Sequence, residues 1–218
     1  MFFSQKDKAK PKRSFRVSTF AGPSDKIKRE IITAPPITDA ALVEKAKQND
    51  RQAFQLLVQR HEQQVRATVL GMLGPVAEAD DVAQEVFIRF FRSLDNFRGD
   101  AQLTTYLSRI AINLSLNELK RRQRAQKRFL FWQRSDTTIP DPADEHADPA
   151  RMDDQQLVRQ ALQYIDADYR SVIILRLLDG YSVKETAEIL DIPMGTVASR
   201  LARGLDKLKE VIVRWKAM

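Results

Sequence analysis

Residues 78–124 constrain the fold most, because they hold two helical patterns joined by a short break that contains a glycine. The first pattern has an apolar stripe at helical spacing, formed by Val82, Val86, Phe87, Phe90 and Leu94. Acidic and amide side chains gather on its other side: Asp80, Asp81, Gln84 and Glu85. The second pattern predicts burial of Leu107, Ile110, Ala111 and Leu114. Two amphipathic helices are therefore expected here.

The outer side of the second helix is polar and basic. Steps of four, three, one and three residues keep one set on a single face: Asn113, Asn117, Lys120, Arg121 and Arg124. The break at residues 96–100 adds the aromatic Phe97 and the cation Arg98. The acidic face thus suits a basic protein partner, and the basic face suits nucleic acid.

The composition indicates a helical protein of one large or two small domains. The 218 residues are 43% hydrophobic, and nine prolines and seven glycines cluster as they do in linkers. Long alternating runs of β-branched residues are missing, so strands are not expected. The net charge of +7 fits a polyanionic partner, although a solvated surface would also explain it.

The absence of cysteine excludes disulfides and thiolate metal sites and suits a reducing compartment. The sequence contains neither the apolar region of a signal peptide nor an apolar run of membrane-spanning length. We therefore expect a soluble, cytoplasmic protein that uses no cofactor.

The front of the chain is expected to be a basic arm followed by a helical bundle. Residues 1–38 are rich in lysine and arginine without apolar periodicity, which predicts a disordered arm, either a solvated tail or an extra contact to DNA or polymerase. Asp39 is expected to cap a short helix to Lys47, and Asp50 a long helix that ends at Gly74. With the two helices above, these make a four-helix domain over residues 39–124. His61 is interpreted as a packed histidine rather than a metal ligand.

Residues 125–154 are expected to form a flexible acidic linker. Prolines alternate there with carboxylates, which repel one another and keep a segment extended.

Residues 155–218 are expected to form a helix-turn-helix domain. Ser182 and Glu185 form a capping box, residues 191–192 make a turn, and Pro193 starts the next helix. The core face of that last helix is predicted to contain Val197, Leu201, Leu205, Leu208 and Ile212. Its outward side would carry Gly195, Ser199, Ala202 and Arg203, flanked by Thr196, Ala198 and Arg200. Arginine there can read guanine or clamp a phosphate.

Three segments in the first domain resemble the second conserved region of bacterial sigma factors, especially the extracytoplasmic-function group: residues 81–87 (DVAQEVF), 94–100 (LDNFRGD) and 106–113 (YLSRIAIN). Tyr106 replaces a more usual Trp, and Leu103 a common Phe. Residues 179–182 (DGYS) and 193–201 (PMGTVASRL) resemble the fourth region, which contacts the promoter −35 element.

The resemblance implies an all-α sigma factor that is not an enzyme, with core RNA polymerase and promoter DNA as partners. An anti-sigma factor is a further candidate partner, because many relatives are held inactive by one. The residues implied to dock to the largest-subunit coiled coil of the polymerase are Asp80, Asp81, Gln84, Glu85, Phe87 and Phe91.

For the −10 element, residues 96–102 and Asn113 are implied to capture an unstacked base. The −10 set is Asn96, Phe97, Arg98, Gly99, Tyr106, Asn113, Asn117, Lys120, Arg121 and Arg124, the last four of which would hold phosphates. The −35 set is Thr196, Ala198, Ser199, Arg200, Ala202 and Arg203. The linker would thread toward the polymerase active centre as a phosphate mimic, or serve as a plain tether.

Two other classes of protein are alternatives to a sigma factor. One is a DNA-binding regulator that uses only the helix-turn-helix, with the front bundle as a sensor or dimerisation domain. The other is an enzyme built on a carboxylate-bridged metal bundle, which needs Glu-x-x-His helices. Neither His61 nor His146 occurs in that arrangement, nor are they placed for a nucleophilic triad, so this class is disfavoured.

Overall fold

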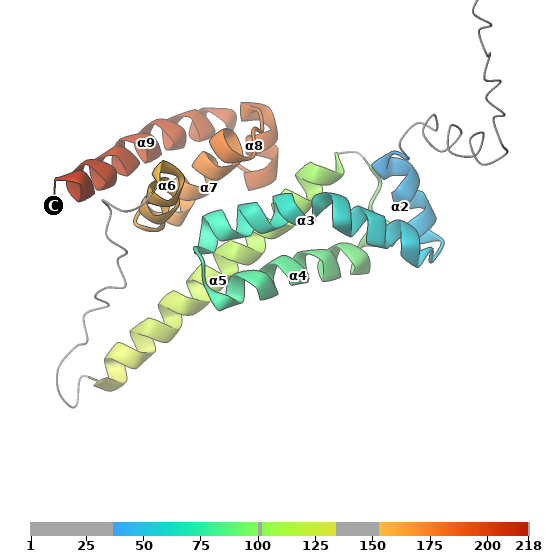
Figure 1. The fold of residues 1–218 in the computed structure, drawn as a ribbon, viewed down its shortest axis with the longest axis horizontal. Coiled ribbons are helices and arrows are strands. Elements are labelled where there is room, and N and C mark those ends of the chain that lie inside the picture. Colours follow the sequence, from blue (N-terminus) through green and yellow to red (C-terminus); the bar gives the residue numbers. More distant parts are fainter. Residues whose placement is uncertain (1–36, 100–101, 134–152, 218) are drawn as a thin grey trace, which may run out of the picture. The chain divides into compact units, whose positions relative to one another are not determined.

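The computed structural model of the protein describes residues 37–99, 102–133 and 153–217. Throughout these residues the regular structure is helical, as predicted (Figure 1). Contacts between residues group Thr38–Met218 into one compact unit. The basic arm and most of the acidic linker lie outside the described residues, so their predicted disorder stays a prediction. None of the described helices is both long and apolar enough to cross a membrane.

Four helices form the front of the unit: α2 (Asp39–Lys47), α3 (Arg51–Leu73), α4 (Ala77–Arg92) and α5 (Leu103–Gln133). A short 3-10 turn, η1 (Leu94–Asn96), follows α4. Helix α3 packs against α2, α4 and α5. The predicted apolar stripes meet in the core, where Val86, Phe90, Leu107 and Ala111 are at most 1% exposed.

Local polar groups set the ends of these helices. Asp50 caps α3 as predicted, since its Oδ1 accepts from the backbone N–H groups of Gln52 and Ala53 at 2.9 and 3.1 Å. Gly74 ends α3 with φ = 77°, a conformation that favours glycine. The predicted cap of α2 was wrong by one residue, because Thr38 rather than Asp39 accepts the capping hydrogen bond, from Ala41.

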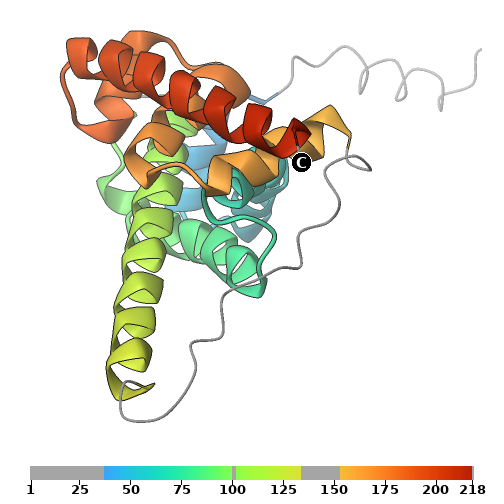
Figure 2. The ribbon, with the colours of Figure 1, turned by 90° about the vertical axis from the view of Figure 1, so that its left-hand side faces the viewer.

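Helix α5 is longer than predicted, and Figure 2 shows it as one uninterrupted helix. The expected linker boundary after Arg124 was therefore wrong, because the helix continues to Gln133. From Lys120 to Arg128 the helix is exposed on nearly every side, so no apolar period reveals this part in the sequence. Arg122, in this part of α5, forms ion pairs with Glu118 of the same helix at 3.0 Å and with Glu78 of α4 at 3.1 Å. The second pair ties this part of α5 to the bundle.

Four further helices follow: α6 (Asp154–Gln163), α7 (Ala167–Ile173), α8 (Val183–Leu190) and α9 (Met194–Lys216). The capping box is confirmed, with Ser182 N–H donating to Glu185 at 2.8 Å and Glu185 N–H donating to Ser182 at 3.2 Å. Pro193 occupies the N-cap position of α9, so the helix begins at Met194, one residue after the predicted start. The left-handed Asp191 (φ = 53°) ends α8, so the helix-turn-helix is present.

Two features at the back of the chain are not indicated by helical spacing. Helix α7 is followed directly by a π-helical turn, η3 (Ile174–Leu178), in which Leu177 and Leu178 are exposed. Leu205 was predicted to be in the core but is 39% exposed. Its place is taken by Gly204, where an added Cβ would lie only 3.0 Å from side-chain atoms of Ile173 and Tyr169.

Candidate nucleic-acid and polymerase interfaces

The outward face of α4 carries the predicted acidic and amide side chains. Asp81 and Gln84 are exposed, Asp80 pairs with Arg66 at 2.8 Å, and Glu85 pairs with Arg89 at 3.0 Å. Such exposed pairs contribute little stability, so both carboxylates can exchange partners.

An exposed ring lies on the same helix. Phe91 is 57% exposed and rests on Phe54 with ring centroids 5.0 Å apart. Phe87, predicted for the same surface, instead packs partly into the bundle core. An exposed aromatic ring and carboxylates that can exchange partners, both on one helix, fit a protein partner better than a polyanion.

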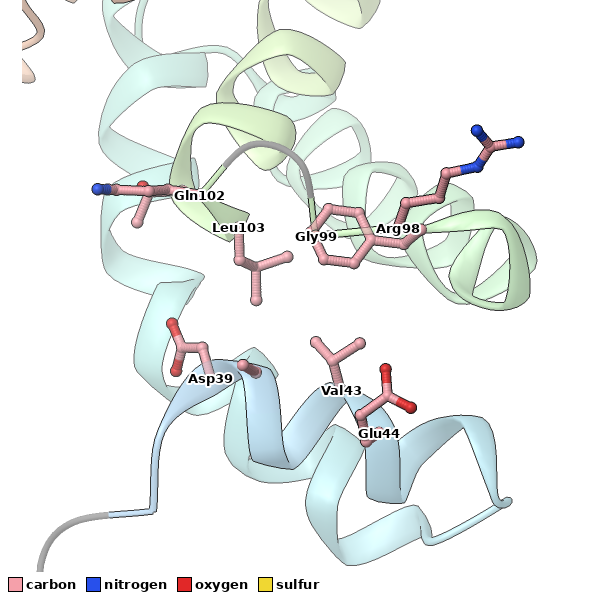
Figure 3. Close-up of a pocket in the computed structure, with 10 residues that line it drawn as sticks. Asp39, Val43, Glu44, Arg98, Gly99, Gln102 and Leu103 are labelled. Atoms are coloured by element: carbon pink, nitrogen blue, oxygen red, sulfur yellow. The ribbon is translucent and has the colours of Figure 1, made fainter.

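The loop after α4 closes one side of a cavity of about 600 Å³ (Figure 3). Its lining combines α2, the loop and the start of α5: Asp39, Ala40, Val43, Glu44, Phe97, Arg98, Gly99, Gln102, Leu103 and Thr104. Gly99 has φ = 77°, which favours glycine, and the Arg98 guanidinium points away from the cavity (Figure 3). The α2 residues could not be predicted for this cavity, because they come together with the loop only through packing.

Asp39 is a carboxylate at this cavity whose negative charge is stabilised by hydrogen bonds. Its Oδ1 accepts from Arg60 at 2.9 Å and its Oδ2 lies 2.7 Å from Nε2 of His61. Burial acts to raise the pKa of Asp39, but the hydrogen bonds from Arg60 and His61 outweigh it and hold the pKa below its ordinary value. His61, 7% exposed, is thus a packed histidine with a carboxylate partner, as expected.

The two aromatic residues assigned to the −10 set support the loop from inside. Phe97 and Tyr106 have ring centroids 5.0 Å apart, and both contact the ring of Phe90. The Tyr106 hydroxyl donates to Oγ of Ser93 at 2.9 Å. Both rings are partly buried, so they fix the shape of the loop as well as offering an aromatic edge.

The predicted polar face of α5 is present, and it borders a groove of about 640 Å³. The groove is lined by Asn117, Lys120, Arg121, Arg124, Lys127 and Arg128. Lys127 and Arg128 were not predicted, because they lie on the part of α5 beyond the expected end of the helix at Arg124. Glu118 holds Arg121 through two hydrogen bonds of 2.7 and 2.9 Å.

Asn113 is exposed on α5 but does not line the loop cavity. It lies nine residues after Thr104, about 13 Å further along the helix axis. The structure therefore does not bring Asn113 together with Arg98 and Gly99.

Helix α9 exposes most of the side chains expected to face DNA. Gly195, Ala198, Ser199, Ala202 and Arg203 are exposed, and Thr196 and Arg200 are partly exposed. Ser199 donates its hydroxyl to the Thr196 carbonyl of the same helix at 3.1 Å. Arg200 is held by Asp168 of α7 at 2.9 Å, so in this state its charge is partly neutralised.

An acidic docking face, a basic helix beside a loop cavity, and a helix-turn-helix on one chain define a DNA-binding transcription protein with a protein partner. The sequence matches the family models described as "Sigma-70 region 2" over residues 57–125 and "Sigma-70, region 4" over residues 155–208. It is 33% identical over 187 residues to the RNA polymerase sigma-H factor of Pseudomonas aeruginosa, covering 81% of this chain and 96% of the relative. It is 34% identical over 178 residues to the ECF RNA polymerase sigma-E factor of Escherichia coli K12, covering 79% and 93%. The chain belongs to the sigma-70 family, in its extracytoplasmic-function group.

Two solved structures are similar in fold. CnrH, solved in complex with the cytosolic domain of CnrY, is 27% identical with a TM-score of 0.59, covering 81% of this chain and 97% of that chain. The sigma factor RpoE, solved in complex with the anti-sigma factor NepR from Bartonella quintana, has a TM-score of 0.55 at 22% identity and covers 73% and 96%.

Proposed function

We propose that this protein binds core RNA polymerase and directs promoter-specific initiation by recognising −10 and −35 elements and assisting promoter melting. The observation that carries the proposal is the presence, on one chain of this family, of the α4 docking face, the α5 groove with its loop cavity, and the exposed side of α9. The chain contributes recognition, and the polymerase contributes the chemistry. It acts in the cytoplasm with the polymerase.

In this proposal each surface has its own task. The α4 face, from Asp80 to Phe91, docks to the polymerase. The loop cavity accepts an unstacked base of the −10 element, since its size suits a planar base and polar groups line its rim. The groove on α5 holds the neighbouring phosphates by charge, which requires no base sequence.

Helix α9 reads the −35 element in the major groove. Arg203 is placed for direct contact, and Arg200 must first leave Asp168. Residues 39–133 and 155–218 are proposed as the two functional domains, since the first domain extends to the end of α5 and the linker begins after it. An anti-sigma factor is the third partner in the proposal, by analogy with the RpoE complex.

The test is transcription by purified core polymerase with the full chain, on a library of random promoters, followed by sequencing of transcript 5′ ends. The expected result is a set of start sites that share two upstream elements. Specific DNA binding without any start sites would instead support the regulator class that uses only the helix-turn-helix.

A charge reversal separates docking from folding. Asp81→Arg with Glu85→Arg should abolish co-purification with core polymerase while leaving helicity unchanged, because like charges at a desolvated contact cost several kcal/mol. The matched control is Glu62→Arg, which reverses an exposed carboxylate on α3. Intact binding by the double variant would remove the docking role of α4.

A further inference from the structure

Helix α3 and the segment just after the π-helical turn are joined by a network of hydrogen bonds. Thr68 Oγ1 lies 2.8 Å from Oδ2 of Asp179, 111 residues away in sequence. Gln64 Nε2 donates to the Tyr181 hydroxyl at 2.9 Å, and that hydroxyl lies 2.8 Å from Oγ of Ser108 on α5. Tyr181 is 6% exposed, so water does not compete for these contacts.

The number of hydrogens at Thr68 favours the protonated form of Asp179 in this contact. Thr68 Oγ1 lies 3.0 Å from the Gln64 carbonyl and 2.8 Å from Asp179 Oδ2, yet a hydroxyl has one hydrogen to donate. With an ionised Asp179, that hydrogen is donated to the carboxylate and shared with the carbonyl. With a protonated Asp179, the carboxyl donates to Thr68 and Thr68 donates undivided to the carbonyl.

The surroundings of Asp179 favour the same neutral form. Helix α3 contributes the uncharged Gln64 and Thr68, and α5 contributes Ser108 to the same network. On its own segment, Tyr181 is neutral, and Arg176 donates instead to the Tyr181 carbonyl. Burial raises the pKa of Asp179 to about 6, and the hydrogen bond that Thr68 donates to the ionised form opposes this rise only in part.

The contact also bears on promoter recognition. Elements at −10 and −35 are separated by about 25 base pairs, which is about 85 Å at 3.4 Å per base pair. The contact between Asp179 and Thr68 is one of those that hold the helix-turn-helix beside α3, and α9 is a helix of 23 residues, about 35 Å long. A chain closed at this contact cannot place both DNA-binding surfaces on their elements together.

We propose that Asp179 is a proton-operated latch, which in its protonated form bonds Thr68 and keeps the helix-turn-helix closed against α3. When the carboxyl ionises, it is solvated better in water than in this contact, and the chain opens to the form that binds polymerase and promoter. The consequence for transcription rests on the proposed function, whereas the closure itself does not.

The closure is measured on the full chain alone, by energy transfer between two dyes. Because the chain lacks cysteine, Gln59→Cys on α3 and Lys209→Cys on α9 place dyes at two exposed positions. With a carboxyl pKa of about 6 when closed and 3.8 when open, the ratio of closed to open chain should fall about tenfold from pH 5 to pH 8. Transfer that does not change over this range would overturn the latch.

Two substitutions test whether the carboxyl of Asp179 is the group that titrates. Asp179→Asn keeps a neutral donor of the same shape, so transfer should stay at its acidic level up to pH 8. Thr68→Val removes the partner and should shift the response to lower pH. The control Asp206→Asn removes an exposed carboxylate of α9 and should leave the profile of the parent unchanged. A pH profile for Asp179→Asn that matches the parent would assign the titration to another group.

Binding to core polymerase tests the consequence of closure for assembly. At pH 8, Asp179→Asn should bind core polymerase up to about tenfold more weakly than the parent, because the closed form competes with docking. Equal affinities would show that closure does not oppose assembly. Since the dye measurement needs neither polymerase nor DNA, failure of the proposed function would be seen separately from failure of the latch.

Discussion

The guanidinium of Arg170 donates a hydrogen bond to the backbone carbonyl of Met72, 98 residues earlier in the chain. It also donates to the carbonyls of Gln163 and Ile165 at 2.8 and 3.0 Å, and to the Gln163 side chain at 2.9 Å. Arg170 is 6% exposed. Burial lowers its pKa to about 10, although Asp166 opposes this effect. A buried cation surrounded by neutral oxygens therefore ties α7 to the end of α3.

Arg170→Met should lower the free energy of unfolding by about 2–4 kcal/mol, because it leaves several buried carbonyls without donors. Urea denaturation followed by circular dichroism measures the loss. Arg214→Met, at an exposed position on α9, is the control and should change stability by less than about 0.5 kcal/mol. Equal stability of the two variants would mean that water replaces the guanidinium at little cost.

The ion pairs of Asp39 predict a pH dependence. The folded pKa of Asp39 lies below its unfolded value, so the stability it contributes is present above pH 3.8 and is lost as pH falls through the lowered pKa. Asp39→Asn should therefore be less stable than the parent at pH 7, by roughly 1 kcal/mol. Thermal unfolding at several pH values should show this difference shrinking below pH 3.8. A difference independent of pH would point to packing rather than charge.

The groove on α5 predicts a specific salt dependence. Arg124→Ala and Lys127→Ala should each reduce the slope of log K against log salt concentration by about 0.7–0.9, if each side chain contacts one phosphate. Binding of holoenzyme to promoter DNA, followed by fluorescence anisotropy, gives the slope. Lys45→Ala, on the exposed side of α2, should leave it unchanged. An unaltered slope in the first two variants would place the DNA elsewhere.

The pair between Arg200 and Asp168 predicts a gain of binding. Asp168→Asn should release Arg200 for DNA and tighten binding to the −35 element by roughly two- to fivefold, as expected for an exposed ion pair. Asp206→Asn removes a carboxylate from α9 itself and controls for the general loss of negative charge. If both variants tighten binding equally, Arg200 is not restrained by Asp168 in solution.

The loop cavity and Asn113 can be separated by substitution, because they lie about 13 Å apart along α5. Ala40→Phe should fill the cavity and impair strand opening while leaving polymerase docking normal. Permanganate footprinting of unpaired thymines reports the opening. If Asn113→Ala impairs opening and Ala40→Phe does not, the unstacked base is captured on the α5 face instead of in the cavity.

Local signals made much of the fold predictable. The cap at Asp50, the glycine at the end of α3 and the box of Ser182 with Glu185 each depend on atoms within four residues, so the sequence alone specifies them. The outward set on α9 was predicted for the same reason, since one face of a helix follows from spacing.

Features that depend on distant packing were not predictable. Ile189 of α8 is 2% exposed because it joins the core shared with α3 and α5, a second buried face that helical spacing does not reveal. The cavity likewise needs Asp39 and Val43 to meet a loop more than fifty residues away. Gly204 displaced Leu205 from the core through close contact with Ile173, which no periodicity indicates.

The length of α5 has a geometric consequence. Leu103 borders the cavity, and Arg124 lies in the basic groove 21 residues later, about 32 Å along one rigid axis. In the proposed function, the helix thereby sets a distance of roughly nine base-pair steps between the captured base and the phosphates in the groove. Inserting a single residue between the two would turn every downstream cation by about 100° around the axis. The proposed function therefore requires the backbone contacts to lie at one fixed register from the melted base, whatever the promoter sequence.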